Sequence, residues 1–255
     1  MKRRVFVAAM PALLAAAGAR AADAASAAAP ASAASAASAS GRRYVALSLV
    51  GDKLTSYTPS RETGSQMAHV QAVTVALTGG LVDRAALEGI AAVLDKADAS
   101  APRSFIAGGK PEFYANQDDW FSGDHAKLPD ELARGVAGEH ATHLVLLTKI
   151  RTDTSHLVRG RVEFGHGRIL GLGVYGNEVP IDVNDKDAQV PGVFVIFAMA
   201  RLSLVDLATS RVVGHQDIEF SQLSQAMTSA ALLQAISDGL ARGIAAELPK
   251  LLAAA

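Results

Sequence analysis

The stretch VFVIFAMARLSLVDLATSRVV, residues 193–213, decides how the second half of the chain folds. Its apolar residues either run without a break or alternate with polar ones, and both patterns are typical of β-strands. The residues Ala208, Thr209 and Ser210 interrupt the pattern and predict a turn. We therefore expect antiparallel strands and hairpins over 160–175 and 193–220, with further turns at Gly165 and Gly214.

Upstream of this region, short apolar runs alternate with amphipathic ones. The patterns predict strands over 44–50, 53–58, 104–107 and 143–150, and helices over 83–97 and 129–138. Gly51 is expected to allow the turn between the first two strands, and Asp83 to cap the first helix. Pro129 is expected in the first turn of the second helix, which ends at Gly138.

The last segment, 225–252, places its large apolar residues along one helical face. Ala235, Gly239 and Gly243 follow at steps of four and would let this helix approach its neighbour closely. Helices alternating with strands, then hairpins, then a closing helix predict a single α/β domain of the α+β kind over 42–255. We expect a mixed sheet with helices packed on it, antiparallel hairpins in its second half and a long C-terminal helix.

The first residues are typical of a secretory signal peptide. Lys2, Arg3 and Arg4 precede an apolar stretch over 5–18, and Ala19-Arg20-Ala21 fits a cleavage site, with residues 22–24 as the alternative. The apolar stretch is shorter than the roughly 20 residues that span a bilayer. We therefore expect a cleaved signal over 1–21, an Ala/Ser-rich flexible spacer over 22–41, and a periplasmic protein without a transmembrane segment, release to the outside remaining open.

The composition excludes several chemistries. The chain has no cysteine, which excludes disulfides, thiolate metal sites, cysteine nucleophiles and an acylated lipoprotein terminus. Without the four cations of the signal, 20 Lys and Arg stand against 25 Asp and Glu. This acidic balance, with no basic stripe interleaved with aromatics, argues against a nucleic-acid partner.

The string Glu139-His140-Ala141-Thr142-His143 is the most metal-like one, because two histidines three residues apart on a helix can ligate zinc. It lacks the metalloprotease spacing, and it falls where we expect a helix to give way to a strand. We expect the rings to point apart, so no metal site is assigned here. Imidazoles at the carboxyl end of a helix are the preferred interpretation.

Two further clusters have ordinary structural interpretations. The glycines at 165, 167, 171 and 173, with His166, are flanked by strand-like residues rather than leading into a helix, which favours a bent or bulged hairpin over a phosphate site. Asp182, Asn184, Asp185 and Asp187 could bind calcium through oxygens, but they lack the EF-hand spacing. A solvated loop between Pro180 and Pro191, available for contacts, is preferred.

No Gly-x-Ser-x-Gly or Ser-x-x-Lys motif occurs, so we expect no enzyme activity, no catalytic residues and no cofactor. A triad assembled from distant segments stays open. The single tryptophan, Trp120, lies near Phe113, Tyr114 and Phe121. Covering the edge of the sheet is the preferred role for this side chain, and anchoring a partner is the alternative.

Residues 201–213, with their Asp-Leu-Ala-Thr-Ser-Arg-Val-Val ending, resemble a hairpin of known periplasmic α/β domains. The similar domains are those of CsgG, FlgO, LpoB and the amino-terminal domain of TolB, and residues 137–146 resemble their helix-to-strand step. Ser210 stands where a turn glycine is usual, and no lipobox cysteine follows the signal. The resemblance implies an envelope assembly factor, regulator or secretion component.

These observations lead to three hypotheses. The first is a soluble, non-enzymatic binding or accessory protein of the bacterial envelope, with envelope proteins as partners. The second is a hydrolase or metal-dependent enzyme that uses His140 and His143. The third is a homo-oligomeric export component with the glycine-rich hairpin 165–176 at its contact surface.

Overall fold

The computed structural model describes residues 41–59, 70–108, 110–154, 157, 167–176, 182 and 184–255. The predicted signal and spacer therefore lie outside the described residues. The helices are α1 (Leu81–Ala97), α2 (Asp130–Gly138), α3 (Ser229–Ala254) and the short 3-10 helices η1 (Pro111–Tyr114) and η2 (Gln117–Trp120). The strands are β1 (Tyr44–Leu49), β2 (Lys53–Pro59), β3 (Val70–Ala76), β4 (Arg103–Ala107), β5 (Phe121–Ser122), β6 (His125–Ala126), β7 (His143–Lys149), β8 (Arg151–Asp153), β9 (Arg168–Leu170), β10 (Leu172–Gly176), β11 (Gln189–Val190), β12 (Phe194–Asp206), β13 (Arg211–Ser224) and β14 (Met227–Thr228).

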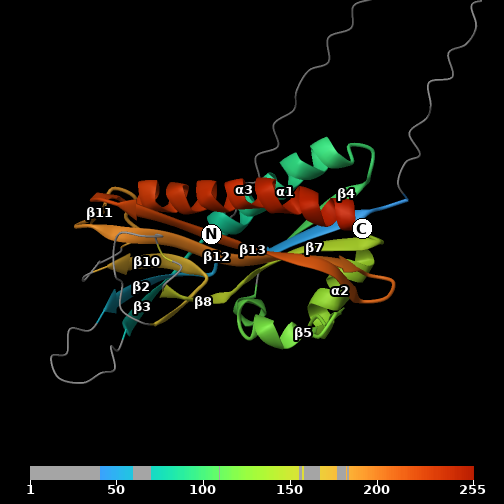
Figure 1. Ribbon diagram of the computed structural model, residues 1–255, viewed down its shortest axis with the longest axis horizontal. Coiled ribbons are helices and arrows are strands. Elements are labelled where there is room, and N and C mark those ends of the chain that lie inside the picture. Colours follow the sequence, from blue (N-terminus) through green and yellow to red (C-terminus); the bar gives the residue numbers. More distant parts are fainter. Residues whose placement is uncertain are drawn as a thin grey trace, which may run out of the picture. The chain divides into compact units, whose positions relative to one another are not determined.

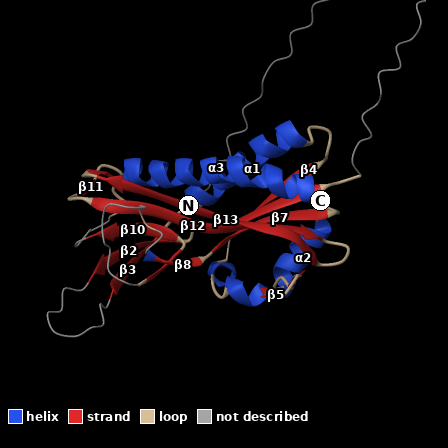
Figure 2. Ribbon diagram, viewed as in Figure 1, coloured by secondary structure: helices blue, strands red, loops and turns tan. Residues whose placement is uncertain are grey.

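Strand β12 is the axis of the main sheet. β13 pairs antiparallel with it from Phe194 to Asp206, whereas the opposite edge of β12 is shared by β10 over 194–198 and β7 over 200–206. Beyond β7 lie β1 and then β4, which are parallel to it, and beyond β10 lie β2 and then β3. The sheet thus forks at Met199 into a β7 branch (β7, β1, β4) and a β10 branch (β10, β2, β3), and Figure 2 shows the strands diverging from this centre.

Helices cover the two faces of the sheet differently. α1 and α3 lie side by side over one face, and α2 lies on the other face beside β7 (Figure 1). The side chains that α3 buries recur every four residues, at Leu232, Ile236, Leu240, Ile244 and Leu248. Burial of each such side chain contributes about 1.5–3 kcal/mol, so this stripe anchors α3 to the sheet.

The predicted fold class is confirmed. The sheet mixes parallel and antiparallel strands, carries helices on its faces and is closed by a long C-terminal helix. The predicted strands at 44–50, 53–58, 104–107 and 143–150, the three helices and the turn at 208–210 are all present. Gly239 and Gly243 face Phe220 and Ile218 at close range, as the small-residue spacing predicted.

Two local predictions are wrong, and the pairing of the first strands was not foreseen. Gly214 is not a turn: β13 runs through it, with a register shift opposite Leu204. Asp83 does not cap α1, because the N-cap position is Gly80 and the Asp83 side chain is turned inward. β3 was missed, and β1 and β2 do not form a hairpin, because the chain crosses from one branch to the other between them.

Candidate functional site

An apolar pocket opens between α2 and the turn that joins β12 to β13. Its volume is about 400 Å³. Most of the side chains around it are small or aliphatic: Ala126, Leu128, Ala133, Val136, Ala137, Ala141, Thr142, Val205, Leu207, Ala208 and Ser210. Among these lining residues Val136 and Val205 are buried, whereas Ala133 and Ala137 of α2 are exposed.

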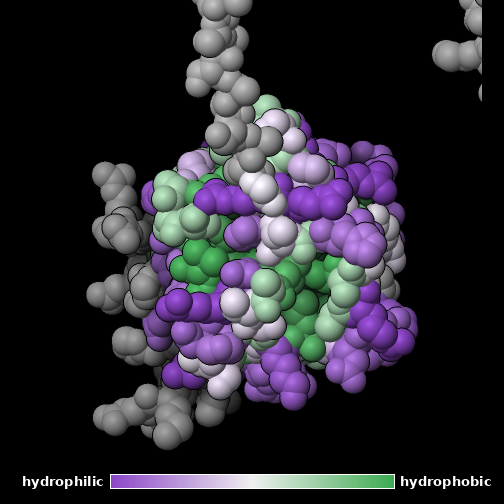
Figure 3. Space-filling view, turned by 90° about the vertical axis from the view of Figure 1, so that its right-hand side faces the viewer, coloured by the Kyte–Doolittle hydropathy of each residue, from purple (hydrophilic) through white to green (hydrophobic). Residues whose placement is uncertain are grey.

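The same end of the molecule is seen face on in Figure 3. Apolar residues gather toward the middle of this face, within a rim of hydrophilic ones. A pocket of several hundred Å³ with a mainly apolar lining and a few polar groups is the usual form of a binding site. This pocket is therefore the candidate binding site of the protein.

Hydrogen bonds hold the mouth of the pocket in place. Asp206 Oδ1 accepts from the backbone N–H groups of Ala208 (2.8 Å) and Thr209 (3.4 Å), and these bonds hold the pKa of the Asp206 carboxyl below its usual range. Thr142 Oγ1 accepts from the N–H of Arg43 at 2.9 Å. Ser210 completes the turn at φ 57, the left-handed conformation usual for glycine. The bond between Thr142 and Arg43 thus holds the residues before β1 beside the pocket.

A second polar feature lies at the fork of the sheet. Asp83, 3% exposed, accepts hydrogen bonds through Oδ1 from Ser48 Oγ (2.7 Å) and from the N–H groups of Val50 and Gly51. Tyr114 Oη lies 2.8 Å from the other oxygen, Oδ2. A Cβ at Gly51 would lie 2.9 Å from Asp83 Oδ2. Glycine is therefore required at this position because the segment after β1 approaches α1 so closely, and less because of the turn.

Lys149 extends this polar cluster. Its ammonium lies 3.0 and 3.1 Å from the two carboxylate oxygens of Asp52 and 5.6 Å from the centre of the Tyr114 ring. Burial lowers the pKa of Lys149 although the bond to Asp52 acts in the opposite direction, and burial followed by the charge of Asp83 raises the pKa of Tyr114. The Asp83 carboxylate, saturated with donors, joins α1 to the end of β1, to the segment after it and to η1.

Gln117 closes the cluster from the η2 side. Its side-chain amide donates to the carbonyl oxygens of Leu49 and Phe113, and its oxygen accepts from the backbone N–H of Lys149 at 2.8 Å. Both the nitrogen and the oxygen of its side-chain amide are therefore bound to backbone groups of the protein. Gln117 is thus a structural residue that fixes η2 against β7.

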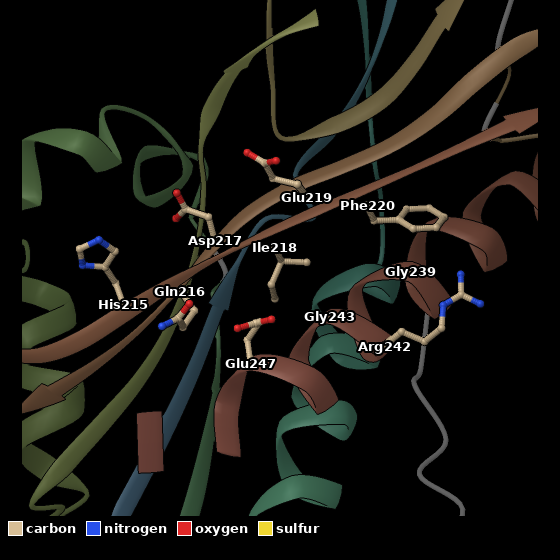
Figure 4. A pocket seen from close by; sticks show the side chains of 10 residues that line it. All are labelled: His215, Gln216, Asp217, Ile218, Glu219, Phe220, Gly239, Arg242, Gly243 and Glu247. Atoms are coloured by element: carbon tan, nitrogen blue, oxygen red, sulfur yellow. The ribbon is translucent and has the colours of Figure 1, made fainter. Parts of the chain in front are cut away.

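Another concave surface runs between β13 and α3, with a volume of about 730 Å³. Figure 4 shows His215, Asp217 and Glu219 pointing away from α3, and Ile218 pointing toward it. Its charges have partners in the chain: Asp217 binds Arg201 at 2.7 Å, and Glu247 binds Lys250 at 2.7 Å. Arg242 lies 5.4 Å from the centre of the Phe220 ring. This groove is more polar than the pocket at α2.

The two histidines of the metal-like string do not form a joint site. His140 is exposed in the left-handed region at φ 51, just after α2. His143 begins β7 with its ring 5.8 Å from that of Tyr44, and burial lowers its pKa. Within the described residues, no group of three or more His, Asp or Glu side chains is arranged to hold a metal ion.

The acidic loop and the glycine cluster have structural roles in the described residues. In the acidic loop, Asp182 and Asp185 accept from the backbone N–H groups two residues later, as in exposed polar turns. Among the glycines, 165 lies outside the described residues, and Gly171 adopts φ 66 between β9 and β10. β10 is an interior strand, buried between β2 and β12. The prediction that 165–176 forms an exposed contact hairpin is therefore wrong for residues 172–176.

Trp120 is 7% exposed and packs with Val205 and the residues of β1 and β7. The predicted cover of the sheet edge is therefore wrong, because the tryptophan packs against a face of the sheet. Sequence reasoning missed the pocket and the Asp83 cluster. Only Asp83 carried a signal: it shares the apolar stripe of α1 with Leu87, Ile90 and Leu94, which is an unusual place for a carboxylate.

No helix in the described ranges is long and apolar enough to cross a membrane. No family model matches the chain, and a search of curated proteins found no match.

Solved structures show distant similarity. Protein XCC0632 from Xanthomonas campestris, of family DUF330, aligns over 84% of this chain and 85% of its own, with 8% identity and a TM-score of 0.37. PelC from Paraburkholderia phytofirmans, solved as a dodecamer, aligns over 80% of this chain and 86% of its own, with 10% identity and a TM-score of 0.29. Such low identities and TM-scores describe only a distant structural similarity, and they assign the chain to no family.

Proposed function

We propose that this chain is a non-enzymatic accessory protein of the bacterial envelope which binds an apolar side chain of a partner protein in the pocket beside α2. The pocket itself is the observation that carries the proposal. It combines buried aliphatic side chains with a mouth held by hydrogen bonds. A preformed pocket of this kind reduces the entropy lost on binding.

The mainly apolar lining of the α2 pocket favours an aliphatic or aromatic side chain as the bound group. Removal of apolar surface from water contributes about 25 cal/mol per Å², and anchor residues of protein interfaces usually fill such pockets. The charged residues next in sequence to the lining are of both signs: Lys127, Arg134 and Arg211, and Asp206. A mixed rim of this type suits a protein surface better than a strongly charged ligand.

The cellular location belongs to the same proposal. The signal-like residues 1–21 support export, and the chain is proposed to act in the periplasm. The β12–β13 hairpin that resembles CsgG, FlgO, LpoB and TolB domains also forms one wall of the pocket. We place the partner among envelope proteins on the strength of these two features, and homo-oligomerisation remains a separate proposal.

The test fills the pocket. Ala137→Leu adds a branched side chain at its mouth, and Ala92→Leu makes the same change on an exposed position of α1 as the matched control. Tagged variants are recovered from envelope fractions after mild crosslinking, and the attached proteins are compared by mass spectrometry. The proposal expects one envelope protein to be lost with Ala137→Leu and retained with Ala92→Leu. Equal recovery with both variants would refute it.

A further inference from the structure

A separate cavity of about 240 Å³ lies at the fork of the sheet, on the solvent side of the polar cluster around Asp83. Its walls come from the starts of β2 and β8, the ends of β7 and β9, and the region from the end of η1 to the start of η2. The lining residues are Lys53, Tyr114, Ala115, Asn116, Gln117, Asp118, Lys149, Arg151 and Leu170. The chain thus brings residues from distant positions to one small polar space.

Three cations converge on this cavity. Lys149 is 6% exposed, and its ammonium is positioned by Asp52 and by the ring of Tyr114. Lys53 is close enough for its charge to lower the pKa of Lys149. Arg151 is exposed at the rim. Like charges gathered in a partly enclosed site repel one another, and an anion placed between them relieves that repulsion.

Among the residues that line the cavity, the three cations outnumber the carboxylates, since Asp118 is the one acidic residue in that lining. Asp83 is saturated by donors from β1, the following turn and Tyr114. Asp52 lies beside Lys149 and compensates that one charge. Asp118, which lines the cavity, is near enough to Arg201 to raise the pKa of that guanidinium. Lys53 and Arg151 have no ion-pair partner among the described residues.

We propose that this cavity binds a small oxyanion, a phosphate or carboxylate group, between Lys53, Lys149 and Arg151. The volume of about 240 Å³ corresponds to about eight water molecules, at about 30 Å³ each, so it admits one small group and not an extended ligand. Arginine offers paired donors to such a group and lysine a point charge. Neutral donors are also available, since Asn116 lines the cavity with its exposed amide. This inference is independent of the function proposed for the α2 pocket.

Anion titration tests the proposal. The purified protein is titrated with inorganic phosphate, and in a second arm with succinate, while sodium chloride holds the ionic strength constant because salt alone screens charges. Binding is followed by calorimetry and by the rise in unfolding temperature that accompanies binding to the folded state. We expect saturable binding of at least one of the two anions, and the stronger arm identifies the preferred group.

Two double variants with the same change in charge decide the location. Lys53→Gln with Arg151→Gln removes two of the three cations of the cavity and should weaken binding about tenfold or more. Arg84→Gln with Lys96→Gln removes two exposed cations of α1 and should leave the affinity within about twofold. The proposal is overturned if neither anion saturates the wild-type protein, or if both double variants lose binding equally.

Discussion

The Oδ1 atom of Asp83 lies 2.7 Å from the Oγ atom of Ser48, which joins the first turn of α1 to the end of β1. Both side chains are buried, and the same oxygen also receives the N–H groups of Val50 and Gly51, where the chain crosses between the two branches of the sheet. One carboxylate therefore fixes α1, β1 and the crossing segment together.

Replacing this carboxylate should be costly. Asp83→Asn keeps the size of the side chain but places an amide group against donors, and we expect a loss of about 2–4 kcal/mol in the free energy of unfolding. Asp95→Asn is the control on the same helix, because Asp95 is 62% exposed where it pairs with Arg103 and should lose less than about 1 kcal/mol. Urea denaturation of both variants checks this, and equal losses would contradict the role assigned to Asp83.

Close packing between α3 and β13 depends on Gly239. A Cβ at this position would collide with the ring of Phe220, so Gly239→Ala should lose about 1–3 kcal/mol of stability. Gly135→Ala is the matched control, because no atom lies within 4 Å of a Cβ in the middle of α2, and it should gain up to about 1 kcal/mol from helix propensity. Thermal denaturation measures both. If the two alanines have the same effect, α3 does not pack as described.

Ser210 carries strain that glycine would relieve. Its φ of 57 places a side chain in the left-handed region, which costs a residue with Cβ about 1–2 kcal/mol. Glycine also raises the conformational entropy of the unfolded chain, which lowers the free energy of unfolding by about 0.5–1 kcal/mol. The free energy of unfolding of Ser210→Gly should therefore rise by about 0.5–1 kcal/mol net. Ser210→Ala keeps the Cβ and should show no gain. Urea midpoints of the two variants separate these outcomes.

The protonation of His143 should weaken the fold in mild acid. Burial, and secondly the charge of Arg42, lower the pKa of His143, while Asp206 opposes the shift. The unfolded chain then takes up a proton at a higher pH than the folded one, so stability falls as pH drops from the ordinary pKa of about 6.5 toward the lowered folded value. The variant His143→Phe keeps an aromatic ring beside Tyr44 and cannot titrate.

The measurement is the difference in unfolding free energy between about pH 7.5 and about pH 5, compared for the two proteins. The wild type should lose more stability than His143→Phe over this interval. Equal losses of stability in the two proteins would mean that folding does not lower the pKa of His143.

Periodicity and turn residues were enough to place most elements. The four-residue spacing in 225–252 predicted both the length of α3 and its close contact through Gly239 and Gly243, because both depend only on local geometry. The fork could not be predicted in this way. β1 and β2 are separated by a short turn, which usually indicates a hairpin, and only the pairing of β12 with both β7 and β10 sends them to different branches.

The candidate site could not be predicted from the sequence for a related reason. The pocket forms because α2 lies against a turn that follows it by many residues in sequence, and its alanines have no chemical signature of their own. The conspicuous strings, such as His140 with His143 or the acidic residues 182–187, are dispersed or exposed. Asp83 was recognisable on the apolar stripe of α1, but a capping role is the usual expectation for an aspartate near a helix start.

The claim that the α2 pocket binds an envelope protein is tested most directly by site-specific photocrosslinking in living cells. A photoreactive residue replaces Ala208 at the mouth of the pocket, or Ala92 on α1 as the control. The account predicts a discrete crosslink to one envelope protein from position 208, absent from position 92 and reduced when Ala137→Leu is introduced together with the probe. No crosslink from position 208, or one that Ala137→Leu leaves unchanged, would contradict the account.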